Sequence, residues 1–127
     1  MKDEAKLWLD QAEEHYKDME YCYNGARFSL AIYSCHQTLE KLLKACIVEN
    51  VGIVPPKNHQ LENLAVQAKL AMTENQLKEL ALLTGHFWKV RYPDFRKHMY
   101  GDRKTVDQIV SKTKELYLWI SKKLDRK

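Results

Sequence analysis

Residues 91–100 hold the side chains best suited to chemistry. Three cations and a histidine lie among three aromatic rings in the order Arg91-Tyr92-Pro93-Asp94-Phe95-Arg96-Lys97-His98-Met99-Tyr100. A guanidinium can bind a phosphate through two parallel hydrogen bonds, and an imidazole can gain or lose a proton near neutral pH. The pairing of Arg91 with His98 therefore suits the handling of a phosphodiester or a nucleotide.

The same segment also allows a structural interpretation. Asp94 can pair with Arg91 or Arg96, Tyr92 and Phe95 can pack over the end of the bundle, and Pro93 can fix a turn. For Asp94 and Tyr92 both interpretations stay open. For His98 the surrounding positive charge favours function.

The charge of the chain changes sign along its length. Residues 1–88 carry 9 Lys and Arg against 12 Asp and Glu, whereas residues 89–127 carry 12 against 5, within a net charge of +4. A solvated helix face would explain such an excess. However, the excess begins at the Arg/His segment, which favours an anionic partner such as RNA or a nucleotide phosphate.

The composition indicates a single all-α domain over residues 1–127. The chain is 45% hydrophobic and 30% charged, and its four Gly and three Pro allow too few turns for an all-β fold. No apolar run approaches the roughly 20 residues that cross a bilayer, and the N-terminus lacks the apolar stretch of a secretion signal. We therefore expect a cytoplasmic protein, in which Cys22, Cys35 and Cys46 are small reduced hydrophobes.

The first half of the chain predicts two long antiparallel helices. Apolar residues at helical spacing place the first over about 3–23, and Asn24-Gly25 would supply the left-handed residues that end it. The second, over about 27–50, has an apolar face broad enough to touch two or three neighbours, so we expect it at the centre. Gly52 and Pro55-Pro56 then force an extended connection.

The second half predicts a short helix and two further long ones. The short helix is expected over about 59–71. Thr73 and Gln76 have capping-box spacing and open a helix that ends near residue 90, and Thr105 and Gln108 repeat this spacing before the last helix. The expected fold is an up-and-down four-helix bundle with an additional short helix.

Other polar residues give weaker signals. The remaining histidines are scattered, without Asp or Cys at ligand spacing, so we expect neither a metal nor a cofactor. His36 and Glu40 lie one helical turn apart and could form a buried hydrogen-bonded pair or reach a dimer cleft. Lys41 and Lys44 are expected to be solvated cations, with phosphate contact as the lesser alternative.

Four motifs, in this order, resemble the HEPN family. They are Trp8-x-x-x-Ala12-Glu13, His36-Gln37-Thr38-Leu39-Glu40-Lys41-Leu42-Leu43-Lys44-Ala45, His59-x-Leu61-x-x-Leu64 and Arg91-Tyr92-Pro93-Asp94. The resemblance covers nearly the whole chain. Within the family the chain resembles the branch with an Arg-Tyr-Pro-Asp motif, whose members are similar to toxin-like partners of minimal nucleotidyltransferases. The resemblance implies a helical bundle, usually dimeric, that binds nucleotides or RNA.

The resemblance also implies roles for particular residues. Many members are metal-independent ribonucleases with an arginine, four to six arbitrary residues and a histidine, a motif that Arg91 and His98 match at its longest spacing. Arg91 would then stabilise charge on the phosphate, while His98 would exchange the proton of the attacking 2′-hydroxyl or the leaving oxygen. We expect the RNA- or nucleotide-binding residues to be Arg91, Tyr92, Arg96, Lys97 and Tyr100.

Two further details bear on activity. Tyr92 stands where active ribonucleases of the family typically have a polar residue, and nucleotide binding is the traditional assignment of this branch. His98-Met99-Tyr100 is similar to the His-x-Tyr ending of a toxin branch in which the partner nucleotidyltransferase modifies the tyrosine.

Two functional hypotheses follow. In the first, the chain is an RNA- or nucleotide-binding module, the toxin-like half of a two-component system with a minimal nucleotidyltransferase, in which metal-independent RNA cleavage is an open question. In the second, it is a non-catalytic helical interaction protein that binds a nucleotidyltransferase partner. Because the family joins two motifs across a two-fold axis, we also expect a homodimer that buries parts of the second and last helices.

Overall fold

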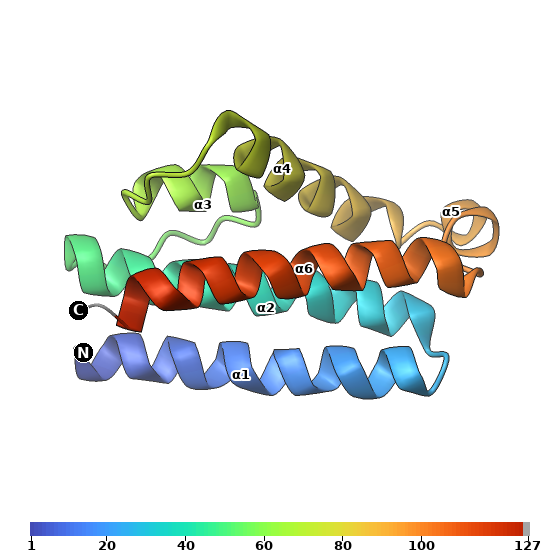
Figure 1. The fold of residues 1–127 in the computed structure, drawn as a ribbon, viewed down its shortest axis with the longest axis horizontal. Coiled ribbons are helices and arrows are strands. Elements are labelled where there is room, and N and C mark those ends of the chain that lie inside the picture. Colours follow the sequence, from blue (N-terminus) through green and yellow to red (C-terminus); the bar gives the residue numbers. More distant parts are fainter. Residues whose placement is uncertain (126–127) are drawn as a thin grey trace.

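Three long helices run side by side and form the body of the molecule (Figure 1). The computed structural model describes residues 1–125. Helix α1 (Asp3–Asn24) runs antiparallel to α2 (Phe28–Val51). Helix α6 (Arg103–Asp125) runs parallel to α2, from the end where α1 turns into α2 toward the end where α1 begins. Helix α1 therefore begins, and α6 ends, at the same end of the molecule. The all-α fold is confirmed.

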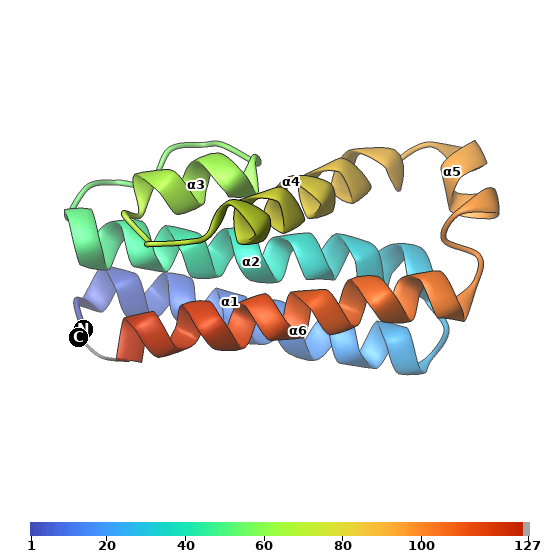
Figure 2. The same cartoon turned by 45° about the horizontal axis from the view of Figure 1, so that its top comes forward.

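The segment between α2 and α6 folds over one side of this body (Figure 2). It contains the short helix α3 (Leu61–Gln67), the longer α4 (Glu74–Lys89) and the small α5 (Pro93–His98). Helix α4 supplies the remaining long helix of the bundle and lies obliquely across α2 and α6. Helix α5 stands at the end of the molecule where α1 turns into α2.

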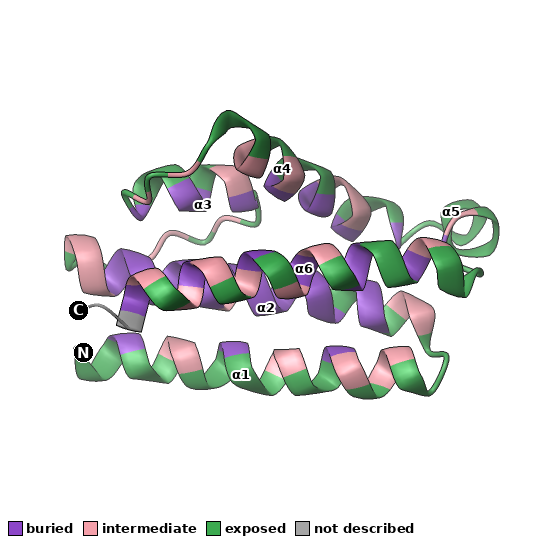
Figure 3. Cartoon of the chain, in the orientation of Figure 1, coloured by how far each residue is buried: buried purple, intermediate pink, exposed green. Residues whose placement is uncertain are grey.

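Helix α2 is central, as its broad apolar face predicted. It packs against α1, α3, α4 and α6, and 16 of its 24 residues are buried (Figure 3). These buried positions include polar and charged side chains at its middle, notably His36, Glu40 and Lys44. The centre of the bundle is thus not purely apolar, and every polar group there needs a partner.

The turn between α1 and α2 differs from the prediction. The left-handed residue is Ala26, with φ of 59°, whereas Gly25 has φ of −86°. The amide of Arg27 reaches back to the carbonyl oxygen of Cys22 at 2.8 Å, which closes the turn. The assignment of Asn24-Gly25 as the left-handed pair was therefore wrong, because backbone closure places that conformation on the next residue. At the end of α2, Gly52 does adopt a left-handed φ of 75°.

Two predicted helix starts have different outcomes. Thr73 forms the complete capping box: its Oγ1 accepts from the Gln76 amide at 3.1 Å, and its own amide donates to Gln76 Oε1 at 2.9 Å. The corresponding role of Thr105 was wrong, because α6 already begins at Arg103. There, Asp102 Oδ1 accepts from the Lys104 amide at 3.0 Å, so Asp102 satisfies the first turn.

The two short helices were predicted less well. Helix α3 spans only Leu61–Gln67 of the predicted 59–71; its first amide donates to Thr84 Oγ1 of α4 at 3.0 Å, and a left-handed Lys69 follows its end. Helix α5 was not predicted, because Pro93 has the residue type and setting of a turn position. Pro93 instead occupies the first position of α5, where its missing amide is tolerated.

The described part of the chain also bears on the membrane and cysteine predictions. None of the helices in residues 1–125 contains an apolar stretch of membrane-spanning length. Cys35 and Cys46 are buried and Cys22 is half-buried, and none of the three forms a disulfide within the described residues. Burial raises the pKa of Cys35 to about 12, so this thiol stays protonated at neutral pH.

Candidate functional site

The predicted binding residues lie on the surface at the end of α4 and on α5. The side chains of Arg91, Tyr92, Arg96, Lys97 and His98 are all exposed, and α5 contains no buried residue. The cations of this segment are therefore accessible to an anion in solution.

Arg91 is held by two aromatic rings. Its guanidinium carbon lies 4.4 Å from the centre of the Phe87 ring and 4.8 Å from that of Trp88. Within residues 1–125 Arg91 forms no hydrogen bond or ion pair through its side chain, so the structural alternative in which Asp94 pairs with it is not realised. Stacking restrains a guanidinium through its face and leaves its N–H edges available to a ligand.

His98 makes no direct contact with Arg91 within the described residues. It lies at the end of α5, exposed, and no hydrogen bond, ion pair or ring contact joins it to Arg91 in the described residues. A phosphate bound by both side chains would therefore have to lie between them or be shared with a second copy of the chain.

Tyr100 has a different environment from the other predicted residues. It is only 1% exposed, and its hydroxyl forms a 2.7 Å hydrogen bond with Nδ1 of His86. Burial raises the pKa of Tyr100 to about 12 and lowers the pKa of His86. Both groups are thus neutral near pH 7, and ligand contact or modification at Tyr100 would require release of its hydroxyl from this contact.

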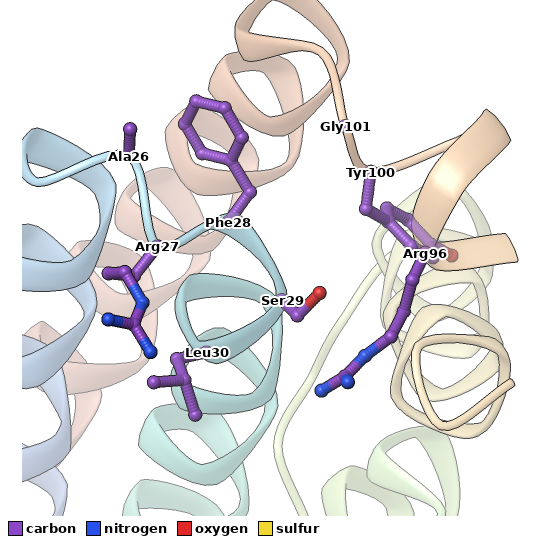
Figure 4. Close-up of a pocket in the computed structure, with 8 residues that line it drawn as sticks. All are labelled: Ala26, Arg27, Phe28, Ser29, Leu30, Arg96, Tyr100 and Gly101. Carbon is purple, nitrogen blue, oxygen red and sulfur yellow. The ribbon is translucent and has the colours of Figure 1, made fainter. Parts of the chain in front are cut away.

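Arg96 lines a pocket of about 470 Å³ at the start of α2 (Figure 4). The pocket brings together side chains from the α1–α2 turn, the first turn of α2 and the α5 region: Ala26, Arg27, Phe28, Ser29, Leu30, Arg96, Tyr100 and Gly101. Ser29 lies between the side chains of Arg27 and Arg96. The pocket therefore adds Arg27 to the accessible cations near α5.

A buried carboxylate organises a second group of polar residues beside Arg91. Glu40 is 1% exposed, and its Oε1 accepts a 2.6 Å hydrogen bond from Nδ1 of His59. Its Oε2 lies 3.4 Å from Nζ of Lys44 and 3.5 Å from Nζ of Lys41. We refer to these residues, together with His36, as the Glu40 cluster.

Glu40 is ionised in this setting. Burial alone would raise the pKa of its carboxyl group, but the hydrogen bond from His59 and the charge of Lys44 outweigh burial and lower the pKa below its usual value. Glu40 therefore acts as a hydrogen-bond acceptor only, and His59 Nδ1 must carry the proton that joins them.

The prediction that Lys41 and Lys44 are solvated was wrong. Lys44 is only 6% exposed and Lys41 is half-buried. The Trp8 ring on α1 covers both ammonium groups. Its centre lies 5.4 Å from Nζ of Lys44 and 5.3 Å from Nζ of Lys41. A buried ammonium needs a compensating partner, and here the Glu40 carboxylate and the Trp8 ring provide it.

His36 is buried, as one alternative predicted, but its partner is not Glu40. Its Nε2 donates to the backbone carbonyl oxygen of His59 at 2.8 Å, its Nδ1 lies 3.2 Å from Nε2 of Gln37, and its ring stacks on Phe87 at 3.8 Å. Burial lowers the pKa of His36 to about 4, and the positive charge of Arg91 contributes to this lowering. His36 is therefore neutral and holds the backbone of His59 in place.

His59 and Arg91 share two neighbours. The His59 ring lies 5.6 Å from Phe87 and 6.2 Å from Trp88, centre to centre, and these are the rings that hold Arg91. The Glu40 cluster and Arg91 thus lie on the same two aromatic rings. Sequence reasoning gave His59 no role beyond a family motif, because 19 residues and an extended connection separate it from Glu40.

No group of three His, Cys, Asp or Glu side chains within the described residues could hold a metal ion. The ionisable side chains of Arg91 and the Glu40 cluster are three cations, two imidazoles and one carboxylate. Such a set can bind a phosphate, and a neutral imidazole in it can exchange a proton.

Comparison with known proteins places this fold and region in a family. Residues 5–124 match the HEPN domain. The chain belongs to the HEPN domain family. Family membership supports a role related to nucleotides or RNA, whereas no curated protein sequence matches the chain.

Two solved structures share the fold of this HEPN chain. TT1696 from Thermus thermophilus has 17% sequence identity and a TM-score of 0.81, with 96% of this chain and 99% of that chain covered. ST0689, an archaeal HEPN homologue, has 18% identity and a TM-score of 0.74, with 97% and 98% covered. At these identities the likeness concerns the fold.

The buried, neutral His36 predicts a loss of stability in acid. A histidine in the unfolded chain takes up a proton near pH 6.5, but folded His36 does so only near pH 4, so the unfolded state binds more protons between these values. We expect the free energy of unfolding to fall by up to about 3 kcal/mol as the pH drops through this window. His86 adds to the loss, since its pKa is also lowered.

Urea unfolding of wild type and His36→Gln across this pH range isolates the contribution of His36. Glutamine keeps a donor for the His59 carbonyl oxygen but cannot be protonated, so its unfolding free energy should depend less on pH. Equal pH dependence in the two proteins would contradict the assignment.

The Tyr100–His86 contact predicts a stability loss that is specific to one hydroxyl. Tyr100→Phe removes a buried hydrogen bond and leaves His86 Nδ1 without its partner, which is expected to cost about 1 to 2 kcal/mol of unfolding free energy. Tyr92→Phe is the matched control, because the Tyr92 side chain is 61% exposed. Thermal or urea unfolding measures both, and an equal effect of the two substitutions would show that Tyr100 is not held as described.

Proposed function

We propose that this HEPN chain binds RNA or a nucleotide through Arg91 and the neighbouring cations of α5. The observation that carries the proposal is the state of Arg91: an exposed guanidinium restrained on Phe87 and Trp88, whose N–H groups have no protein hydrogen bond in residues 1–125. Such a group is prepared for a phosphate, because little side-chain freedom remains to be lost on binding.

The surroundings of Arg91 support a nucleic acid or nucleotide as the anion. Arg96, Lys97 and His98 add exposed cations on α5, which lies in the basic part of the chain. Trp88, Tyr92 and Phe95 are 44%, 61% and 41% exposed and offer ring faces on which bases can stack. Phosphate contacts next to stacking surfaces are the usual combination for single-stranded nucleic acid.

Metal-independent RNA cleavage belongs to the same proposal. Arg91 would stabilise the charge that accumulates on the phosphate, and His98 would exchange a proton with an oxygen of the reacting group. Since Arg91 and His98 are not in contact within one chain, we propose that the site is completed in a homodimer by His98 of a second copy. The system would be a toxin-like chain with a minimal nucleotidyltransferase as its partner protein.

The second candidate is a non-catalytic interaction protein that binds a nucleotidyltransferase. The burial of Tyr100 favours it, because a tyrosine that a partner enzyme modifies has to be accessible. The exposed rings of Trp88, Tyr92 and Phe95 would then contact the partner instead of bases. A small nucleotidyltransferase encoded beside this chain would support the two-component system under either candidate.

RNA cleavage in the presence of a chelator tests the catalytic part. We expect Arg91→Ala and His98→Ala each to lower the rate by about 100-fold or more, since each removes a group that acts in the transition state. Arg91→Lys should recover little, because an ammonium cannot make the bidentate contact. The rate is measured on a labelled RNA at enzyme excess.

Lys78→Ala is the control for this experiment. Lys78 is an exposed cation at the other end of α4, paired only with the exposed Glu74 among the described residues, so its loss should leave cleavage and RNA affinity unchanged. Cleavage that survives both Arg91→Ala and His98→Ala would show that the site is elsewhere. Absence of both RNA cleavage and RNA or nucleotide binding in the wild type would favour the interaction protein.

Mixing of variant subunits tests the composite site. At micromolar concentration the protein is expected to have twice the chain mass of 15.0 kDa. After subunit exchange between Arg91→Ala and His98→Ala, half of the dimers are mixed and each has one intact site, so about a quarter of the wild-type rate should return. A monomeric mass, or no recovery despite demonstrated exchange, would contradict a site shared between two chains.

A further inference from the structure

We propose that His59, held by the buried Glu40, forms part of the Arg91 site and that its Nε2 accepts the 2′-hydroxyl of a ribonucleotide whose phosphate Arg91 binds. The inference rests on the proposed RNA or nucleotide binding and narrows it to ligands that contain ribose. His59 would take the proton of the attacking hydroxyl, and His98 would supply a proton to the leaving oxygen.

The hydrogen bond to Glu40 determines which nitrogen of His59 faces the ligand. Because the carboxylate can only accept, the proton of the 2.6 Å bond belongs to Nδ1. In the neutral imidazole Nε2 is then unprotonated and acts as an acceptor. The His59 side chain is 48% exposed, and Nε2 has no hydrogen-bond partner within residues 1–125. A bare imidazole nitrogen that is open to solvent can accept a hydroxyl proton.

The ring of His59 is held from several sides. Lys44 and Lys41 bind the other oxygen of Glu40, so the carboxylate cannot turn away without leaving two partly or fully buried ammonium groups uncompensated. His36 binds the backbone carbonyl oxygen of His59 at 2.8 Å. A carboxylate behind an imidazole is an arrangement that fixes the tautomer and orientation of a general base. Glu40 is therefore a positioning residue.

Arg91 and His59 can bind two adjacent groups of one nucleotide, the 3′-phosphate and the 2′-hydroxyl. Both contact Phe87 and Trp88, and the Trp88 side chain is half-exposed. The cations Lys41, Lys44 and Arg91 outnumber the single carboxylate of Glu40, which leaves the region positive and attracts a phosphate. In RNA the 2′-hydroxyl lies next to the 3′-phosphate on the same ribose. Arg91 can therefore bind the phosphate while Nε2 of His59 accepts a hydrogen bond from the hydroxyl.

The resulting step balances without a metal or another reactant. Nε2 of His59 takes the 2′-hydroxyl proton as the 2′-oxygen forms a bond to phosphorus. The bond from phosphorus to the 5′-oxygen breaks, its electron pair goes to that oxygen, and His98 or water supplies the proton. The products are a 2′,3′-cyclic phosphate and a 5′-hydroxyl, and His59 then returns its proton to solvent.

His59→Asn tests this role with little disturbance of the fold. The asparagine amide stands near the position of Nδ1 and can still donate to Glu40, but nothing replaces Nε2. We expect the rate of RNA cleavage to fall by about 100-fold or more. We also expect wild type to bind a 2′-hydroxyl RNA about tenfold more tightly than DNA of the same sequence, and His59→Asn to lose this preference. His15→Asn on α1 is the control, and thermal unfolding verifies that each variant folds.

The outcomes separate this inference from the proposed function. If wild type binds or cleaves RNA and His59→Asn matches it in rate and in RNA-to-DNA preference, His59 is not part of the site, while the proposed function stands. If wild type binds RNA without cleaving it, the role of His59 is decided by whether His59→Asn loses the preference for RNA over DNA. If wild type neither cleaves RNA nor binds RNA or a nucleotide, both proposals are rejected.

Two further variants examine the geometry. Glu40→Gln keeps an acceptor oxygen but removes the charge, and is expected to lower kcat more than it raises KM, as loss of positioning requires. Mixed dimers of Arg91→Ala and His59→Asn should regain no activity, because both residues serve the same site from one chain. Recovery in these dimers would place His59 in the site of the partner subunit and overturn the assignment.

Discussion

The buried carboxylate of Glu40 is the interaction on which the middle of this bundle depends. It lies on the central helix, 1% exposed, and compensates the ammonium groups of Lys41 and Lys44. Removing one member of such a buried set leaves an uncompensated charge, at a cost of about 3 to 5 kcal/mol. The Trp8 ring on α1 covers the same lysines. The carboxylate thus joins the long α1–α2 pair to the segment that carries the site.

This constraint also connects the fold to its chemistry. The extended connection after α2 returns the chain so that His59 meets Glu40, and Phe87 of α4 packs against both His36 and Arg91. The position of Arg91 therefore depends on the same packing that orients His59. Helix α5 differs, because none of its residues is buried and its cations are exposed. The buried part of the site lies on the bundle and the exposed part on α5.

Local patterns predicted the long helices, the central position of α2 and the capping box at Thr73, because helical period and cap chemistry depend on near neighbours in sequence. Features that depend on distant partners were missed. Lys44 is buried because α1 supplies Trp8, and Tyr100 is buried because its hydroxyl meets His86. His59 carried no local signal for a site, since its partner is 19 residues earlier. Arg91 was identified from residue type, but its stacking on Phe87 and Trp88 required the structure.

The tautomer of His59 is the most direct test of this account. Long-range ¹H–¹⁵N spectra of the wild-type protein, at a mildly alkaline pH where an ordinary histidine is neutral, distinguish a protonated nitrogen from a bare one. The account predicts a proton on Nδ1, which Glu40 accepts, and a bare Nε2. A proton on Nε2 with a bare Nδ1 would contradict it, because Glu40 would then receive no hydrogen bond from His59 and the only bare nitrogen would face the carboxylate instead of the ligand.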